Sequence, residues 1–171
     1  MTFILSLTAM PYMVQKQVMT HQLQGEIIPP GEKRVMVPTI SWTPEMSVDV
    51  ALIDEQHKKL IEIINTLNSA IEENAATPVL DQVFDELTEY TRKHFSTEEE
   101  LLVRAEYPQT VVHKEEHDGF IYQLIAFRND FENGSEVVST KIVEFLYGWL
   151  VKHILGSDKA YCASLHEKGI R

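Results

Sequence analysis

Apolar side chains recur at alternating spacings of three and four residues through most of the chain after Trp42. This period is typical of amphipathic α-helices that bury one face. It predicts four helices: about residues 49–74, a second starting at Thr77-Pro78, a third over about 110–131 and a fourth containing 142–153. The predicted buried positions are, helix by helix, Ile53, His57, Leu60, Ile64, Leu67 and Ile71; Leu80, Phe84, Leu87, Thr91, His94, Glu98, Leu101 and Ala105; Thr110, His113, His117, Phe120, Leu124, Phe127 and Phe131; and Ile142, Leu146, Trp149 and His153.

The breaks between these segments carry recognisable turn residues. Thr77-Pro78 suits an N-cap followed by proline at the first helical position. Tyr107-Pro108 ends the second helix, Asn133-Gly134-Ser135 ends the third, and Gly156 interrupts the fourth before a short C-terminal helix. Short turns between amphipathic helices predict an all-α fold, an antiparallel up-down four-helix bundle over residues 41–171.

Residues 1–40 differ in composition and form a predicted N-terminal extension or extended arm. They contain the turn-like stretch IIPPGEKR and the extended-looking VMVPTI. Met36 is an alternative start of the chain. The apolar run near Met1 has no basic residue before Lys16 and is too short to span a bilayer, so we expect neither a secretory signal nor a membrane anchor, and a cytoplasmic location.

Charge and cysteine content narrow the classes of function. The 171 residues carry a formal net charge of −11, which is unfavourable for binding nucleic acid or an anionic membrane surface. Cys162 is the single cysteine, so disulfide frameworks and cysteine-based zinc or iron–sulfur sites are excluded.

Histidines and one glutamate occupy positions on the apolar stripes of all four helices. A lone histidine on such a face is usually a core residue bonded to a carbonyl, and a lone buried carboxylate costs several kcal/mol. Six such positions on four facing stripes fit a shared cation better than six separate partners. The candidate ligands are His57, His94, Glu98, His113, His117 and His153.

Asp158 lies five residues after His153, off the stripe of a continuous helix. Gly156 could end the helix and turn Asp158 towards the centre of the bundle. Alternatively, Asp158 could stabilise the N-terminus of the short helix that follows. The residue pattern leaves both interpretations open.

The number and type of ligands point to two transition-metal ions. Five imidazoles and two carboxylates exceed one tetrahedral zinc site, and calcium and magnesium prefer oxygen. Imidazole with carboxylate suits iron. Two octahedral ions that share two carboxylates and an oxo or hydroxo bridge would keep a single open position for a small ligand. A ligand set rich in neutral imidazole favours reversible dioxygen binding over oxygen activation.

Four stretches give the chain a resemblance to the hemerythrin family, in particular to the single-domain bacterial hemerythrins. They are WTPEMSVDVALIDEQHKKL, HFSTEEELLVRAEYP, HKEEHDGF and WLVKHILGSDKAY, which together cover about residues 41–165. The resemblance implies a non-heme di-iron centre that binds dioxygen. His113, His117 and His153 would hold one iron, and His57 and His94 the other, which keeps the open position.

The resemblance also implies further roles. Glu98 and Asp158 would bridge the two irons, and Trp149 and Leu150 would line the oxygen pocket. Outside what the resemblance implies, Glu99, Glu100, Glu115 and Glu116 are expected to face solvent rather than to act as ligands, and His21 and His166 to be surface residues outside the site.

The predicted function is storage, delivery or scavenging of dioxygen by a monomer that is not an enzyme, with an oxygen-requiring enzyme as a candidate recipient. Two alternatives remain: an oxygen or redox sensing module that acts through a partner, and a di-iron peroxide or nitric oxide reductase.

Overall fold

The computed structural model describes residues 38–135 and 137–171. The chain divides into two units, Met1–Met36 and Val37–Arg171, and the described residues belong to the second. The predicted arm at 1–40 therefore lies almost entirely outside the described residues, and its role stays a prediction. The described helices are η2 (Pro44–Met46, a 3₁₀ turn), α2 (Ala51–Glu72), α3 (Ala76–Arg104), α4 (Thr110–Glu132), α5 (Val138–Trp149), η3 (Leu150–Asp158, a π-helix) and α6 (Lys159–Glu167).

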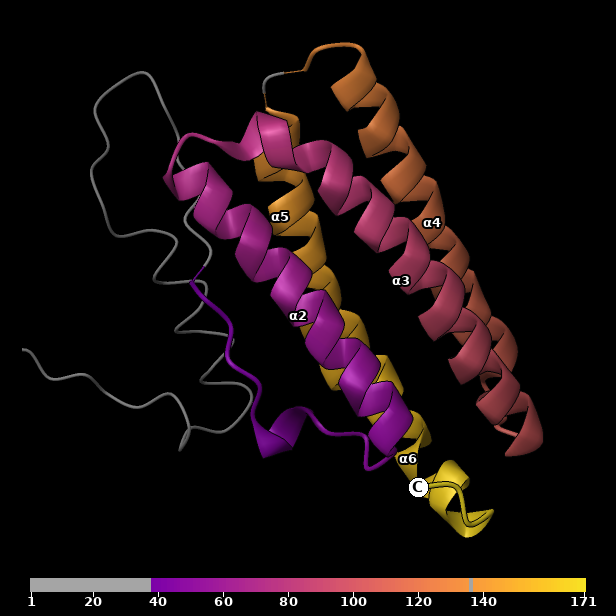
Figure 1. Cartoon of the computed structure of the whole chain (residues 1–171). Helices are drawn as coiled ribbons and strands as arrows, with labels where there is room; N and C mark the ends of the chain where they lie inside the picture. Colours follow the sequence, from indigo (N-terminus) through magenta and orange to yellow (C-terminus); the bar gives the residue numbers. More distant parts are fainter. Residues whose placement is uncertain (1–37, 136) are drawn as a thin grey trace, which may run out of the picture. The chain divides into compact units, whose positions relative to one another are not determined.

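The long helices lie side by side in an antiparallel bundle, and α6 continues beyond the end of η3 (Figure 1). Helix α2 packs on α3 and α5, and α4 packs on the same two helices. No strand occurs between residues 38–135 or 137–171. The predicted all-α bundle is therefore confirmed.

The predicted stripes are buried along most of their length, with two adjustments. Leu102 is fully buried where Leu101 was expected, and Leu101 is only partly buried. Thr110, Phe131 and Trp149 are also partly rather than fully buried. The second helix begins at Ala76, two residues before Pro78, so proline occupies the first turn but not its first position. Proline is tolerated there because backbone N–H groups of the first turn have no partner within the helix.

Four helices end with the same backbone motif. The residue after each C-cap has a positive φ: Asn74 at 56°, Glu106 at 53°, Gly134 at 79° and Gly169 at 72°. The next N–H then bonds a carbonyl in the last turn, as from Ser135 to Asp130 at 3.0 Å. These two features define a Schellman ending, which satisfies carbonyls that the helix leaves free. The predicted end of the third helix at Asn133-Gly134-Ser135 is confirmed.

The predicted interruption at Gly156 is wrong. The chain stays helical from Val138 to Glu167, and Gly156 lies inside the π-helical segment without a positive φ. In an α-helix residues five apart differ in direction by about 140°. The i→i+5 bonding of a π-helix places such residues one turn above each other, so His153 and Asp158 can share a face. Wider winding, rather than a break, turns Asp158 inwards.

Beside α6, an apolar cluster covers the end of the bundle. Val48 and Val50, which precede α2, pack there with Ile53, Leu102 and Tyr161. The Lys159 ammonium donates to the backbone carbonyl of Ser47, which fastens this segment to the start of α6. The cluster therefore fixes the position of Tyr161, which contacts the candidate site. Among the described residues, no helix combines the length and apolar character needed to cross a bilayer.

Two glycine substitutions distinguish continuous winding from a helix break. An added Cβ at Gly156 meets nothing within 4 Å. We therefore expect Gly156→Ala to raise the free energy of unfolding by about 0.5–1 kcal/mol, because alanine loses less backbone entropy. Gly134→Ala is the control, and should lower it by about 1 kcal/mol because of the left-handed backbone. Thermal unfolding of the metal-free protein measures both. If both variants lose a similar amount of unfolding free energy, the chain breaks its helix at Gly156 after all.

Candidate metal centre

Seven polar side chains from α2, α3, α4 and η3 meet in the apolar interior. All seven predicted ligands belong to this group, and each is at most 3% exposed. They form two sets of four ligand atoms, within each of which all atoms lie within 4.8 Å of one another. Glu98 belongs to both sets. The sets are Glu98, His113, His117 and His153, and His57, His94, Glu98 and Asp158.

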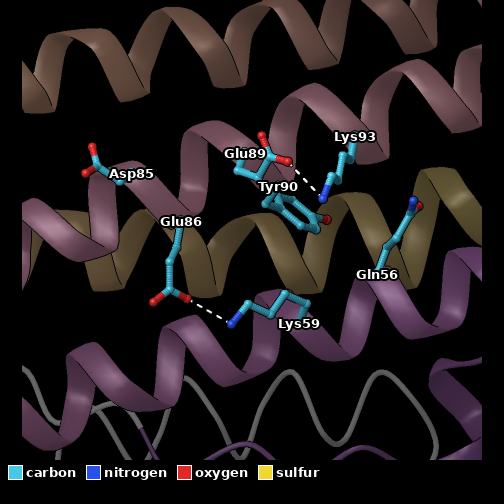
Figure 2. Close-up of a pocket in the computed structure, with 7 residues that line it drawn as sticks. All are labelled: Gln56, Lys59, Asp85, Glu86, Glu89, Tyr90 and Lys93. Atoms are coloured by element: carbon cyan, nitrogen blue, oxygen red, sulfur yellow. Dashed lines mark ion pairs between the residues drawn. The ribbon is translucent and has the colours of Figure 1, made fainter.

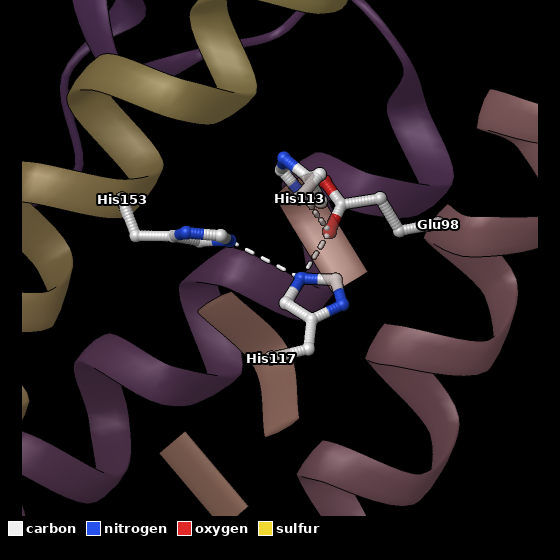
Figure 3. Close-up of side chains that lie close together, drawn as sticks. All are labelled: Glu98, His113, His117 and His153. Carbon is white, nitrogen blue, oxygen red and sulfur yellow. Dashed lines mark hydrogen bonds and ion pairs between the residues drawn. The ribbon is translucent and has the colours of Figure 1, made fainter. Parts of the chain in front are cut away.

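The first set joins three imidazoles to one carboxylate (Figure 3). Glu98 Oε2 lies 3.2 Å from His113 Nε2 and 3.1 Å from His117 Nε2. His117 Nε2 and His153 Nε2 are 3.2 Å apart. The two histidines of α4 are four residues apart, so they project from one helix face one turn apart. The Nε2 atoms thus converge on one point from α4 and η3.

The second set contains the other two imidazoles. His57 Nε2 lies 3.2 Å from Asp158 Oδ2, and His94 Nε2 lies 3.7 Å from Glu98 Oε2. The two rings meet edge to face, with centroids 4.9 Å apart. His57 comes from α2 and His94 from α3, so this set links the two helices in the interior of the bundle.

Asp158 contacts both sets of ligands. Its Oδ2 atom faces His57, whereas Oδ1 lies 3.1 Å from His153 Nε2 and 3.5 Å from His113 Nε2. Between the two interpretations of Asp158 that the sequence left open, the structure places its side chain in the centre of the bundle. A carboxylate in this position could bridge two cations.

Burial keeps several of the imidazoles in the neutral form. It lowers the pKa of His57 to about 4, that of His94 to about 3 and that of His153 to about 2. A neutral imidazole offers a lone pair to a metal ion. Burial, with the nearby carboxylates of Glu98 and Glu116, raises the pKa of Asp158 well above its usual range. The centre therefore disfavours a second buried negative charge unless a cation is present.

Unpartnered atoms show that the residues fit a metal ion. Among the described residues, both ring nitrogens of His57, His94 Nε2 and both oxygens of Asp158 are buried and, despite the close contacts above, make no hydrogen bond. Buried polar atoms are normally satisfied, and each unsatisfied one costs about 1–3 kcal/mol. Cations bound among these atoms would satisfy them together. Nitrogen-rich ligation with shared carboxylates suits a transition metal such as iron.

Aromatic rings hold three of the imidazoles in place. Phe95 stacks on His117 at 3.8 Å between centroids and Trp149 on His153 at 3.9 Å. Tyr90 stacks on His94 at 4.9 Å. These rings fix the imidazole planes and surround the ligand atoms with carbon.

Besides the stacked rings of Phe95 and Tyr90, four residues whose polar groups contact the ligands were not predicted as partners. Gln56 Oε1 lies 3.0 Å from His94 Nδ1, Glu99 Oε1 lies 3.0 Å from His117 Nδ1, and Glu116 Oε2 lies 2.5 Å from His153 Nδ1. The fourth is Tyr161, whose buried hydroxyl donates to Glu98 Oε1. The prediction that Glu99 and Glu116 simply face solvent is wrong, because each has one carboxylate oxygen turned to an imidazole. Glu100 and Glu115 are exposed as predicted.

The positions of the remaining predicted residues can also be stated. Leu150 is buried at the start of η3. The ring contacts of Trp149 are with His153, His117, Phe95 and Phe120, on the side of the three-imidazole set. His166 is partly buried rather than at the surface, and His21 lies outside the described residues.

A cavity of about 420 Å³ lies beside the two-imidazole set, between α2 and α3 (Figure 2). Its inner wall includes Gln56 and Tyr90, both of which contact His94. The Tyr90 hydroxyl is buried without a hydrogen-bond partner. Lys59 of α2 and Glu86 of α3 form an ion pair across the cavity at 2.9 Å. Solvent can thus come close to one side of the centre.

Comparison with known proteins agrees with this geometry. Residues 48–163 match the family described as the hemerythrin HHE cation binding domain. A bacteriohemerythrin of Stenotrophomonas maltophilia (strain R551-3) is 35% identical over 120 residues, which are 70% of this chain and 77% of that protein. A bacteriohemerythrin of Clostridium acetobutylicum is 31% identical over 124 residues, which cover 70% of this chain and 96% of the relative.

Solved structures show the same fold. The crystal structure of a hemerythrin with a leucine-to-alanine substitution superposes with a TM-score of 0.66 at 28% identity. The match covers 74% of this chain and 96% of the other. The chain therefore belongs to the hemerythrin family, as the sequence motifs predicted. Family membership and the histidine and carboxylate cluster together support an iron centre.

The same substitution at two tyrosines should change stability in opposite directions. Tyr161→Phe leaves a buried Glu98 oxygen without its donor, so we expect a loss of about 1–3 kcal/mol in the free energy of unfolding. Tyr90→Phe removes a buried hydroxyl that has no partner, so we expect a gain of about 1 kcal/mol. Denaturant unfolding of the metal-free protein tests both. Equal losses would contradict the contrast between the two hydroxyls.

Proposed function

We propose that the protein binds dioxygen reversibly at a non-heme di-iron centre, for storage, delivery or scavenging. The observation that carries the proposal is the pair of ligand sets that share Glu98, with seven buried side chains and five imidazoles. Two iron ions held there would supply the reversible binding of dioxygen. Family membership supports the same conclusion.

In this proposal each ligand set holds one iron. His113, His117 and His153 complete one coordination sphere, whereas His57 and His94 belong to the other, which has fewer protein ligands. Glu98 and Asp158 would bridge the two positions. The geometry that supports the bridging role of Asp158 is the approach of its two oxygens to imidazoles of different sets. The set with fewer imidazoles would leave room for a small ligand.

The composition of the ligand set favours binding over oxidation of a substrate. The di-iron carboxylate proteins use mainly glutamates, with one histidine from each of two helices. Additional carboxylates stabilise oxidised iron by charge, whereas neutral imidazoles add donors without negative charge. Five imidazoles with two carboxylates therefore suit a carrier better than an oxidase, and we propose that the protein is not an enzyme.

Neighbouring side chains would protect the centre from water. Leu150 is buried, and Trp149 covers one face of His153. We propose, as the family resemblance implies, that both belong to the oxygen pocket. A small neutral ligand enters such an apolar pocket without loss of hydration energy, whereas water and protons are disfavoured. The monomeric state, the cytoplasmic location and the enzyme that receives dioxygen stay predictions.

Optical spectra with iron analysis test this function. We expect two irons per chain and a visible charge-transfer band in air that bleaches on removal of oxygen and returns on its addition. Glu98→Ala should reduce the iron content to one or none, because both sets lose a shared ligand. Glu100→Ala, at an exposed position two residues away, is the control and should keep both irons. Two irons without a reversible band, or repeated turnover of peroxide or nitric oxide with a reductant, would favour an enzyme.

Substitution of Leu150 tests the oxygen pocket. Leu150→Asn should accelerate autoxidation several-fold, because a polar side chain admits water beside the bound dioxygen. Leu146→Asn, one turn earlier and equally buried, is the control for a loosened core. The decay of the visible absorption band, followed by stopped-flow or conventional spectrophotometry, measures the autoxidation rate. Equal autoxidation of Leu150→Asn and the native protein would remove Leu150 from the pocket.

A further inference from the structure

The imidazoles of the two ligand sets differ in the partner of Nδ1, the ring nitrogen that points away from the centre. In the three-imidazole set, His117 and His153 each have an Nδ1 atom against a carboxylate, from Glu99 and Glu116 respectively. In the two-imidazole set, His94 Nδ1 faces the neutral amide of Gln56, and His57 Nδ1 is buried without a partner among the residues that the structure describes. Within residues 38–135 and 137–171, carboxylates therefore contact the Nδ1 atoms of only one of the two sets.

We propose that the two metal positions are unequal, and that the set Glu98, His113, His117 and His153 binds its ion first and more tightly because Glu99 and Glu116 position and polarise its imidazoles. This inference rests on the proposed di-iron function and adds an order in which the ions bind. Glu99 and Glu116 act through His117 and His153, and are positioning residues rather than ligands.

The chemical reason is the effect of a carboxylate on an imidazole. A carboxylate that accepts the Nδ1–H fixes the tautomer whose Nε2 lone pair faces the metal. It also draws the proton towards itself, which makes Nε2 a stronger donor to a cation. An amide oxygen orients the ring but carries no charge, so it strengthens the donor less. Loss of such an outer partner typically reduces metal affinity about 10–100-fold.

Each carboxylate is held in place by a further contact. Glu99, on α3, receives an ion pair from Lys114 of α4 at 2.6 Å. Glu116, on α4, also accepts a hydrogen bond from the Ser157 hydroxyl of η3 at 2.8 Å. The links from Glu99 to α4 and from Glu116 to η3 join three of the elements that carry ligands. These contacts hold the two carboxylates that orient imidazoles of the three-imidazole set.

The outer contacts of the other set are fewer and weaker. Gln56 contacts His94 and also lines the cavity of about 420 Å³ between α2 and α3 (Figure 2). Its second hydrogen bond, to the Thr97 hydroxyl, is long at 3.4 Å. The long bond of Gln56 and the Nδ1 partners thus point to the same order of affinity.

A titration of the metal-free full chain with Co²⁺ tests the order. Visible absorption and calorimetry should show two steps of one ion each, with the first at least tenfold tighter. Glu99→Gln and Glu116→Gln should each weaken the first step about 10–100-fold and leave the second nearly unchanged. Gln56→Glu should strengthen the second step and bring the two affinities closer together.

Matched controls separate positioning from surface charge and from folding. Glu100→Gln and Glu115→Gln remove the same charge from exposed neighbours, and should leave both steps unchanged. The visible Co²⁺ spectrum at one equivalent should change in Glu99→Gln and Glu116→Gln but not in these controls. Unfolding midpoints of the metal-free variants show whether the fold is intact.

A single step with equal affinities in the native chain would overturn the inference. So would an unchanged first step in the Glu99→Gln, Glu116→Gln double variant, or an equal weakening of both steps. The titration is independent of dioxygen. Ordered Co²⁺ binding in a protein whose iron form fails to bind oxygen reversibly would refute the proposed function and leave this inference standing.

Discussion

The rest of this structure depends on the free-energy cost of burying imidazoles and carboxylates in an apolar interior. An unpaired buried carboxylate is penalised by several kcal/mol, and each buried polar atom without a partner adds to that penalty. Helices α2, α3 and α4 and the segment η3 all contribute groups to the same small volume, so the penalty is met collectively rather than at each residue. Neutral imidazoles, the shared Glu98 and the hydroxyl of Tyr161 reduce it, and a bound cation would remove most of the remainder.

This constraint explains why so much of the fold and centre could be predicted from the sequence. Polar residues on an apolar stripe are conspicuous when, like His57 or His113, they interrupt a regular period of leucine, isoleucine and phenylalanine. The helices followed from the same period, and the end of α4 followed from Asn133-Gly134-Ser135 because few residues accept a left-handed backbone.

The residues that were missed lie where periodicity carries no information. Glu99 and Glu116 are at the edge of the buried stripe, with partly exposed side chains, and only the neighbouring helix decides which way they turn. Gln56 and Tyr161 contact ligands that are distant in sequence. Gly156 was misinterpreted because glycine is common at helix ends, whereas the wider turn of η3 depends on backbone bonding that no local residue pattern specifies.

The π-helical segment has a consequence for protein design. The other ligand-bearing helices repeat every 3.6 residues, but Leu150–Asp158 is wound more widely, so its side chains follow a different angular phase. Grafting the seven side chains onto an ideal, straight four-helix scaffold would place His153 correctly and rotate Asp158 away from the centre. A transplanted centre must therefore copy this stretch of backbone, or move the aspartate by one position so that an α-helical spacing of four replaces the spacing of five.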